Sequence, residues 1–388
     1  MSKDAFNSSD SARSAKPLRH ARHAKLPGAL PLELGGELSD ITVCYETYGT
    51  LAPDGGNAVL VCHALSGDSH VAPHDAGDDP GWWDIAVGPG KPIDTDRYFV
   101  ICPNLLGGCR GTTGPNSVNP RTGRPYGPDF PSITIADMAD VQRRLVEHLG
   151  IRQLLAVIGG SMGGHLVQAW AVRHSDVCRG AIALATASRV TTQSLAFDVV
   201  GRNAILHDPN FHGGRYYGKG PGPHIGLAIA RMIGHITYLS GEAMKQKFGA
   251  DRYQPRDVPT TFETAFSVGS YLGYQGHKFV ERFDANSYIL LTKAMDLFDL
   301  GDSPEALVRA YSPSRCRWLV MSFTSDWLFP TRETRAVVHA LNAVAANVSF
   351  VEVDSDKGHD AFLLEDPRYH GLLRATFDRI AAGLASCM

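Results

Sequence analysis

Residues 154–163 read LLAVIGGSMG, an apolar run that ends in a serine flanked by glycines. The five apolar residues predict a buried β-strand, and residues 165–174 that follow predict a helix. The serine therefore lies in a sharp strand-to-helix turn, where side chains larger than glycine would collide with the strand and the helix. A G-x-S-x-G sequence in this context is typical of a nucleophile elbow, so Ser161 is the predicted nucleophile.

Two later residues supply the partners that a serine nucleophile needs. A serine hydroxyl reacts poorly at neutral pH unless a base lies within hydrogen-bond reach and an acid orients that base. Asp326 follows one late predicted strand and His359 follows the last one, so we predict a triad of Ser161, Asp326 and His359. Asp354 and Asp356 are competing acids, but they lie too near His359 in sequence for this layout.

Short apolar runs alternate with helical patterns along most of the chain. Several runs are apolar throughout, as expected for strands covered on both faces. The predicted strands are residues 58–62, 98–102, 154–158, 181–185, 318–322 and 348–353. Thr134, with Asp137 three residues later, predicts the capped start of a helix. The alternation predicts a mostly parallel sheet with helices on both faces. Together with the serine elbow, it predicts an α/β-hydrolase fold.

The alternation stops between residues 191 and 311, where helical periodicity dominates. We interpret residues 191–311 as a helical lid inserted over the C-terminal edge of the sheet. Residues 26–190 and 312–388 then form the hydrolase core, which closes with a helix from about residue 369 to 384. Residues 1–25 are rich in Ser, Ala, Lys, Arg and His, which predicts a disordered tail rather than a secretion signal.

The composition limits the classes of function. The 388 residues are 44% hydrophobic and 20% charged, as in ordinary globular proteins. The net charge of −3 gives no electrostatic case for nucleic acid or an anionic membrane, and no apolar run approaches transmembrane length. The seven cysteines and the histidines show no metal-binding spacing, so we predict no metal site. Unpaired thiols are compatible with a reducing cytoplasm.

Two loops are expected to line the site. An oxyanion hole needs two preorganised backbone N–H groups, and the residue after the nucleophile, Met162, is expected to supply one. The loop HALSG at residues 63–67 follows an early predicted strand, and Leu65 is the expected second donor. The glycine-rich residues 107–115 lack the spacing of a phosphate-binding P-loop, so they are interpreted as a loop beside the site.

Several longer motifs are spread over about residues 40–375. They are HALSGDSH (63–70), WW (82–83), GPGK (88–91), DTDRYFV (94–100), GGCRGTTGP (107–115), GGSMGG (159–164), ARMIGHITY (230–238), RFDANSY (282–288), SDW (325–327) and GHDAF (358–362). Together they resemble the α/β-hydrolase-type homoserine O-acyltransferases of methionine biosynthesis. The resemblance implies ping-pong chemistry, in which Ser161 takes an acyl group from acyl-CoA and passes it to the hydroxyl of an amino acid, with His359 as base.

The resemblance also implies residues that hold the amino acid. The family uses an arginine for the carboxylate and an aspartate for the ammonium, and the matching positions are Arg231, on the predicted lid, and Asp360, beside His359. A planar guanidinium suits a carboxylate. Tyr238 lies two helical turns after Arg231 and is a further expected site residue. A solvated lid charge for Arg231 and a packing aromatic for Tyr238 are the alternative interpretations.

The expected acyl donor is acetyl-CoA, with no bound cofactor. Relatives that prefer succinyl-CoA tend to carry arginine two positions after the triad aspartate, whereas this chain has Leu328, which suits a methyl group and gives a carboxylate no partner. The resemblance also implies a homodimer. His165, Ala169 and Gly269 depart from the family, which usually has methionine, glutamate and glutamate there.

Other functions remain open alongside the expected homoserine O-acetyltransferase. One is a succinyltransferase or a serine O-acyltransferase of the same mechanism. Another is a lidded esterase, which would have a wide apolar pocket and no need for a charged pair such as Arg231 and Asp360. A binding module without activity is disfavoured because all three triad residues are present.

Overall fold

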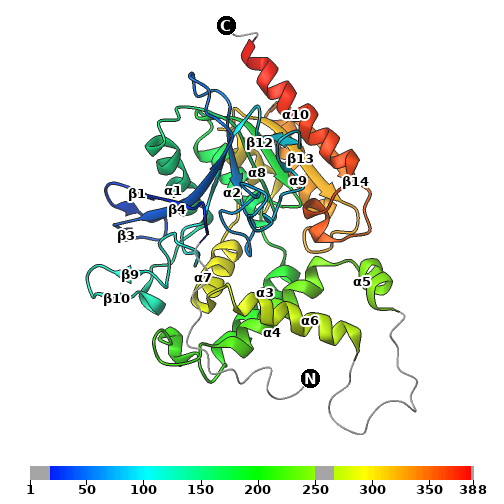
Figure 1. Ribbon diagram of the computed structural model, residues 1–388. Helices are drawn as coiled ribbons and strands as arrows, with labels where there is room; N and C mark the ends of the chain where they lie inside the picture. The colour runs from blue at the N-terminus through cyan, green and yellow to red at the C-terminus, as the bar shows by residue number, and fades with distance from the viewer. Residues whose placement is uncertain (1–17, 250–265, 386–388) are drawn as a thin grey trace.

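A central β-sheet with helices on both faces organises the molecule (Figure 1). The computed structural model describes residues 18–249 and 266–385. Within them the sheet has eight strands in the order β1-β4-β8-β5-β11-β12-β13-β14. Neighbouring strands are parallel from β8 to β14, and antiparallel between β1, β4 and β8. The predicted mostly parallel sheet is therefore confirmed.

All the predicted strands are present, with small shifts at their ends. They are β5 (Ala58–Cys62), β8 (Phe99–Pro103), β11 (Leu154–Gly160), β12 (Cys178–Leu184), β13 (Arg317–Phe323) and β14 (Val348–Val353). Every residue of β5 and β11 is buried, because helices cover both faces of the central strands.

Two strands of the eight-stranded sheet were not predicted from the sequence. β4 (Thr42–Tyr48) mixes polar and apolar residues, and β1 (Arg22–Lys25) pairs with it at the edge of the sheet. The prediction of a disordered tail is therefore wrong for Arg22–Lys25. Three of the four side chains of β1 are exposed, so this edge strand shows no apolar pattern. Residues 1–17 of the predicted tail lie outside the described residues.

Helices pack on the two faces of the sheet and create two apolar clusters. α1 (Ile135–His148), α2 (Met162–Arg173), α8 (Pro304–Tyr311) and α9 (Thr331–Ala343) contribute to one cluster, and α10 (Pro367–Ala385) contributes to the other. Each of the two faces of β11 contributes to a cluster, so that Val157 belongs to one cluster and Ile158 to the other. The predicted cap is confirmed, since Thr134 and Asp137 form a reciprocal capping box at the start of α1.

The lid helices lie between β12 and β13 in sequence and below the sheet in Figure 1. They are α3 (Thr192–Leu206), α4 (His224–Tyr238), α5 (Gly241–Phe248), α6 (Ser267–Val280) and α7 (Ala285–Asp296). α8 falls inside the predicted insertion but packs against α9 of the core, so the lid ends earlier than residue 311. Residues 250–265 of the predicted lid lie outside the described residues.

Short elements complete the described fold. Three two-stranded sheets pair β2 (Leu30–Pro31) with β3 (Glu37–Leu38), β6 (Val87–Gly88) with β7 (Ile93–Asp94), and β9 (Val118–Asn119) with β10 (Arg124–Pro125). The 3-10 helices are η2 (Gly127–Asp129), η3 (His212–Gly214) and η5 (His359–Leu363). Among the described helices, none has the length and hydropathy needed to cross a membrane.

Candidate active site

Ser161 lies at the tip of the turn between β11 and α2. Its φ of 58° and ψ of −125° are a backbone conformation that residues other than glycine rarely adopt. The Ser161 N–H donates to the carbonyl oxygen of Leu184 on β12 at 3.0 Å, which holds the turn against the sheet. A Cβ atom on Gly163 would lie 2.2 Å from the carbonyl oxygen of Cys62. The close approach of helix and strand therefore requires glycine beside the serine.

The side chains of His359 and Asp326 form a buried pair. His359 Nδ1 donates to Asp326 Oδ2 at 2.8 Å, and the other carboxylate oxygen accepts the N–H groups of Leu328 and Phe329 at 3.0 and 2.9 Å. Burial lowers the pKa of His359, but the charge and hydrogen bond of Asp326, with the charge of Asp360, outweigh burial and raise it. The imidazole is thus oriented by a fixed carboxylate and readily accepts a proton.

The two competing acids bond to other partners. Asp354 Oδ1 accepts the Thr324 hydroxyl at 3.0 Å. Asp356 pairs with the Lys357 ammonium at 2.9 Å and accepts from the Gln246 amide at 3.0 Å. Neither is hydrogen-bonded to His359 in the described structure, whereas Asp326 is.

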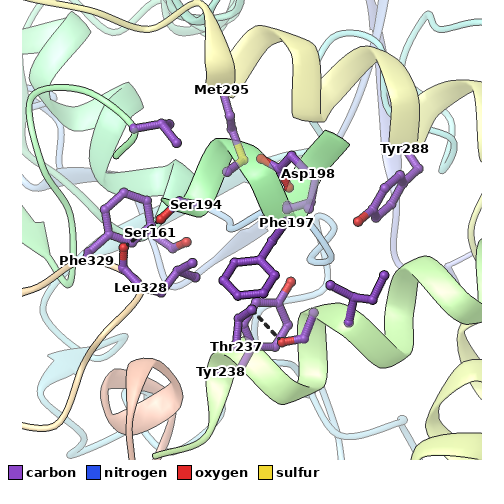
Figure 2. A pocket seen from close by; sticks show the side chains of 14 residues that line it. Ser161, Ser194, Phe197, Asp198, Thr237, Tyr238, Tyr288, Met295, Leu328 and Phe329 are labelled. Atoms are coloured by element: carbon purple, nitrogen blue, oxygen red, sulfur yellow. Dashed lines mark hydrogen bonds between the residues drawn. The ribbon is translucent and has the colours of Figure 1, made fainter. Parts of the chain in front are cut away.

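A pocket opens in front of Ser161 between the core and the lid (Figure 2). Most of its lining side chains are apolar or aromatic: Leu65, Val190, Phe197, Ile233, Tyr238, Tyr288, Met295, Leu328 and Phe329, with Ser161, Ser194, Asp198, Gly234 and Thr237 completing it. Lid and core are joined at its edge, where the Ser194 hydroxyl donates to the Leu328 carbonyl oxygen at 2.9 Å. The arrangement provides a largely apolar chamber for a small group attached to the serine.

The two expected oxyanion donors flank this chamber. Leu65 lines the pocket together with Ser161, and Met162 is the first residue of α2, where helical N–H groups have no intrahelical acceptor. Neither backbone N–H donates to a protein acceptor within the described ranges. Both are therefore available to a ligand oxygen.

Arg231, Tyr238 and Asp360 lie close to the histidine. The Arg231 guanidinium carbon is 5.6 Å from the centroid of the Tyr238 ring, and that ring is 6.0 Å from the ring of His359. Burial raises the pKa of Asp360, although the charges of His359 and Arg231 act against it. Arg231 Nε is buried without a hydrogen-bond partner in the described part of the chain. The structure thus brings a cation and an acid together beside the proposed base.

The ionisable pocket residue Asp198 was missed in the sequence. Asp198 on α3 points into the chamber (Figure 2), and burial together with the neighbouring Asp296 raises its pKa well above the usual range. Arg202, one turn along α3, pairs with Asp296 at 2.5 Å. The spacing of Asp198 and Arg202 was the available signal, but it is equally typical of a solvated helix face.

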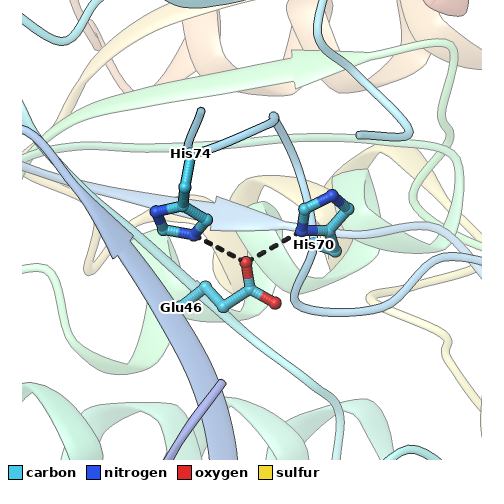
Figure 3. A group of neighbouring side chains, drawn as sticks. All are labelled: Glu46, His70 and His74. Carbon is cyan, nitrogen blue, oxygen red and sulfur yellow. Dashed lines mark hydrogen bonds and ion pairs between the residues drawn. The ribbon is translucent and has the colours of Figure 1, made fainter. Parts of the chain in front are cut away.

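Glu46 and His70, both buried, and the half-buried His74 form a cluster that sequence spacing did not reveal (Figure 3). Their ligand-type atoms lie within 4.8 Å of one another, as in a metal site. Glu46 Oε2 accepts from His70 Nδ1 at 2.9 Å, from His74 Nε2 at 2.8 Å and from the Tyr48 hydroxyl at 2.9 Å.

The charges of this cluster already balance. The hydrogen bond to Glu46 raises the pKa of His70 to about 9, despite burial. Burial opposes the charge of Glu46, but the hydrogen bonds from His70, His74 and Tyr48 outweigh it and lower its pKa. The cluster is thus explained as an ion pair between β4 and the loop after β5, without a metal ion. The absence of a metal site stays a prediction.

Two of the residues that depart from the family pattern, His165 and Gly269, have different surroundings. His165 is fully buried on α2, stacks on Phe298 at 4.5 Å and meets Phe329 edge-on at 5.5 Å. Neither ring nitrogen has a partner among the described residues. Burial, helped by the charge of His359, lowers the pKa of His165 to about 3, so its ring is neutral. A Cβ at Gly269 would meet nothing within 4 Å.

A serine on a strand-to-helix turn, with a histidine and an aspartate after later strands of a mostly parallel sheet, defines the class of α/β hydrolases. The family described as "alpha/beta hydrolase fold" matches residues 57–366. The chain is 50% identical to a homoserine O-acetyltransferase of Rhodospirillum rubrum, over 95% of this chain and 94% of that protein. It is 54% identical to one of Rhodopseudomonas palustris, over 89% and 87% of the two chains. The chain belongs to the homoserine O-acetyltransferase family.

Other relatives extend the comparison. A bifunctional methionine biosynthesis protein MetXA/MetW of Rhodopirellula baltica is 54% identical over 94% of this chain, which spans 59% of that protein's length. The crystal structure of a homoserine O-acetyltransferase from Bacillus anthracis matches with a TM-score of 0.82 and 29% identity, covering 94% of this chain and 98% of that one. The esterase E22 matches with a TM-score of 0.83 and 28% identity, covering 92% and 99%.

Proposed function

We propose that this protein transfers the acetyl group of acetyl-CoA to the hydroxyl of L-homoserine, a step of methionine biosynthesis. The observation that carries the proposal is the position of Arg231 and Asp360 beside the His359–Asp326 pair. A hydrolase needs the histidine and aspartate, but only a transferase with an amino-acid acceptor needs a paired cation and anion next to them.

In the first half-reaction, Ser161 Oγ attacks the thioester carbonyl while His359 Nε2 takes the hydroxyl proton. Asp326 stabilises the imidazolium that forms. The N–H groups of Leu65 and Met162 receive the charge that develops on the carbonyl oxygen. The C–S bond then breaks, the thiolate of CoA takes the proton from His359, and the acetyl group stays on Ser161.

In the second half-reaction, the homoserine hydroxyl attacks the acetyl-enzyme and His359 takes its proton. Arg231 holds the carboxylate of the amino acid, and Asp360, in its ionised form, holds the ammonium. The ester bond to the serine breaks, and His359 returns the proton to Ser161 Oγ. The apolar lining of the chamber disfavours water as a competing nucleophile.

Leu328 supports acetyl rather than succinyl as the transferred group. Its side chain lines the chamber in front of Ser161. An apolar wall suits a methyl group, whereas a terminal carboxylate would lose its hydration there without gaining a partner. Succinyl transfer and serine as acceptor are the alternatives within this mechanism.

Hydrolysis is the second candidate function. The structural similarity to the esterase E22, with a TM-score of 0.83, favours it as an alternative because the same scaffold carries that protein. An acetyl-enzyme would then react with water, and Arg231 and Asp360 would have no ligand.

The assembly that we propose is a homodimer joined through the lid. Large apolar side chains are exposed on α3 and α4, several of them at helical spacing on one face: Leu195, Val199, Leu206, Ile225, Ile229 and Ile236. Light scattering of the purified protein measures the assembly directly. A cytoplasmic location is supported by the free thiols of the six cysteines in the described ranges.

The test of the proposed function is release of CoA from acetyl-CoA or succinyl-CoA, each with homoserine, with serine or with no acceptor. Homoserine-dependent release from acetyl-CoA, with matching O-acetylhomoserine, is expected. Faster release from succinyl-CoA would overturn the assignment of the donor. Release that does not depend on an acceptor would favour the hydrolase.

A further inference from the structure

A second pocket adjoins the chamber of Ser161. The two share the loop after β5, where Leu65 lines the chamber and Ser66 lines the second pocket, and they share α4. Arg231 on α4 stands between them. Its guanidinium carbon lies 5.6 Å from the Tyr238 ring, which lines the chamber, and 4.8 Å from the Phe279 ring, which lines the second pocket.

Cationic side chains dominate this second pocket. It is lined by Arg110, Arg231, Lys278 and Arg282, against the acids Asp68 and Asp79. His70 also lines the pocket, but Glu46, which accepts a hydrogen bond from His70 Nδ1 at 2.9 Å, balances its charge. The pocket is therefore positive although the whole chain carries a net charge of −3.

Three of these cations, Arg110, Arg231 and Arg282, are arginines of the same pocket. Arg110 pairs with Asp68 at 2.9 Å, and Arg282 Nη1 donates to the carbonyl oxygen of Ser66 at 2.8 Å. Burial lowers the pKa of Arg282; the charge of Asp68 opposes this lowering, and the charges of Arg231 and Arg110 add to it. An anion in the pocket would relieve the repulsion between these arginines.

We propose that this pocket binds the phosphate groups of the CoA donor, with Arg110, Lys278 and Arg282 as the contacts. The inference rests on the proposed acetyl-CoA reaction. In CoA a long pantetheine arm separates the thioester from the diphosphate and the 3′-phosphate. With the thioester at Ser161, the phosphates must therefore lie outside the chamber, where charged donors suit them. The half-buried indole of Trp82 lines the same pocket and supplies an apolar surface for the adenine.

Lys278 is the residue on which to test this proposal. It is exposed on α6, with its ammonium 5.8 Å from the centroid of the Tyr274 ring, so its substitution disturbs no buried contact. Lys278→Glu reverses one charge at the pocket. Lys293→Glu reverses an exposed lid charge on α7 that does not line the pocket, and is the matched control.

Two thioesters separate phosphate binding from chemistry. Acetyl-CoA carries the phosphates, whereas S-acetylpantetheine lacks them. Lys278→Glu is expected to raise the KM for acetyl-CoA about tenfold or more, with the KM for S-acetylpantetheine and for homoserine unchanged. Lys293→Glu is expected to change none of the three. An equal effect of Lys278→Glu on both thioesters, or no effect on acetyl-CoA, would overturn the proposal.

Direct binding tests the pocket independently of turnover. Calorimetry with adenosine 3′,5′-bisphosphate is expected to show binding to the wild type that weakens in high salt and in Lys278→Glu but not in Lys293→Glu. Absence of binding to the wild type would overturn the inference. The protein could instead bind adenosine 3′,5′-bisphosphate but transfer no acetyl group to homoserine from either thioester. That result would refute the proposed function and still support a phosphate-binding pocket.

Discussion

Asp326 and His359 are 33 residues apart in sequence, yet Asp326 Oδ2 accepts a hydrogen bond from His359 Nδ1 at 2.8 Å. Asp326 Oδ1 is held at the same time by the N–H groups of Leu328 and Phe329. The two backbone donors fix the rotation of the carboxylate, and the carboxylate in turn fixes which imidazole nitrogen carries the proton.

Asp326→Asn is expected to lower kcat about 10⁴-fold while leaving the melting temperature close to that of the wild type. The asparagine oxygen will accept the Leu328 and Phe329 N–H groups, so its NH₂ group will face His359 Nδ1. The imidazole proton is then driven to Nε2, and the base is blocked. Homoserine-dependent CoA release measures kcat, and Ser161→Ala sets the level of complete loss. A fall of less than tenfold would contradict the role of Asp326.

The rate of acylation is expected to rise with pH through a midpoint above 6.5, the ordinary pKa of histidine. Protonated His359 cannot take the Ser161 proton, and its pKa is raised by Asp326 and Asp360 in spite of burial. Hydrolysis of an aryl acetate gives the profile without an amino-acid acceptor. Asp360→Asn should move the midpoint to lower pH because one of the charges that raise it is removed. A wild-type midpoint below 6.5 would exclude His359 as the titrating base.

Arg231→Lys is expected to raise the KM for homoserine at least about tenfold, since a lysine keeps the charge but cannot form a two-pronged contact with a carboxylate. The rate of acylation of Arg231→Lys by an aryl acetate should equal that of the wild type. Arg215→Lys is the matched control, because Arg215 pairs with Asp129 at an exposed position of the lid. If the KM for homoserine is the same in Arg231→Lys and the wild type, Arg231 does not bind the carboxylate.

Leu328→Arg is expected to shift the ratio of kcat/KM for succinyl-CoA over acetyl-CoA about tenfold or more towards succinyl-CoA, because a guanidinium in the chamber wall can pair with the terminal carboxylate. Leu328→Met keeps the wall apolar and should leave the ratio unchanged. Steady-state assays with both donors measure it. If the ratio changes equally in Leu328→Arg and Leu328→Met, the side chain at position 328 affects donor preference through its shape and not through its charge.

His165→Met is expected to stabilise the protein by about 1–2 kcal/mol at pH 8, because two buried ring nitrogens without partners are removed. The gain should grow as the pH falls. The folded pKa of about 3 lies below the ordinary 6.5, so the unfolded chain binds the extra proton and the wild type loses stability below pH 6.5.

At pH 5 this linkage adds about 2 kcal/mol to the advantage of His165→Met, from the 1.5 pH units between 6.5 and 5. Denaturant titrations at pH 8 and pH 5 measure both values. His339→Met on α9 is the control, because His339 is exposed. A difference that does not change between the two pH values would mean that His165 is not held neutral.

Local patterns predicted the parts of the fold that depend on local chemistry. An apolar run such as residues 154–158 is typical of a strand buried on both faces, so this strand could be predicted. The capping box could be predicted because Thr134 and Asp137 are close in sequence. Ser161 was identifiable because a turn this tight requires glycines beside it. The polar edge strand Arg22–Lys25 was missed because its order comes from pairing with β4 rather than from an apolar pattern.

The sequence by itself determined the parallel sheet, the serine at its turn, and a histidine and acids after the late strands. The order of the strands favoured Asp326 over Asp354, and only the tertiary structure shows the Asp326 carboxylate 2.8 Å from His359 Nδ1. The tertiary structure also gathered Glu46, His70 and His74 into one network, and Arg110, Lys278 and Arg282 into one pocket. The members of each group come from segments that are far apart in the chain. A local sequence pattern cannot predict which distant segments come into contact.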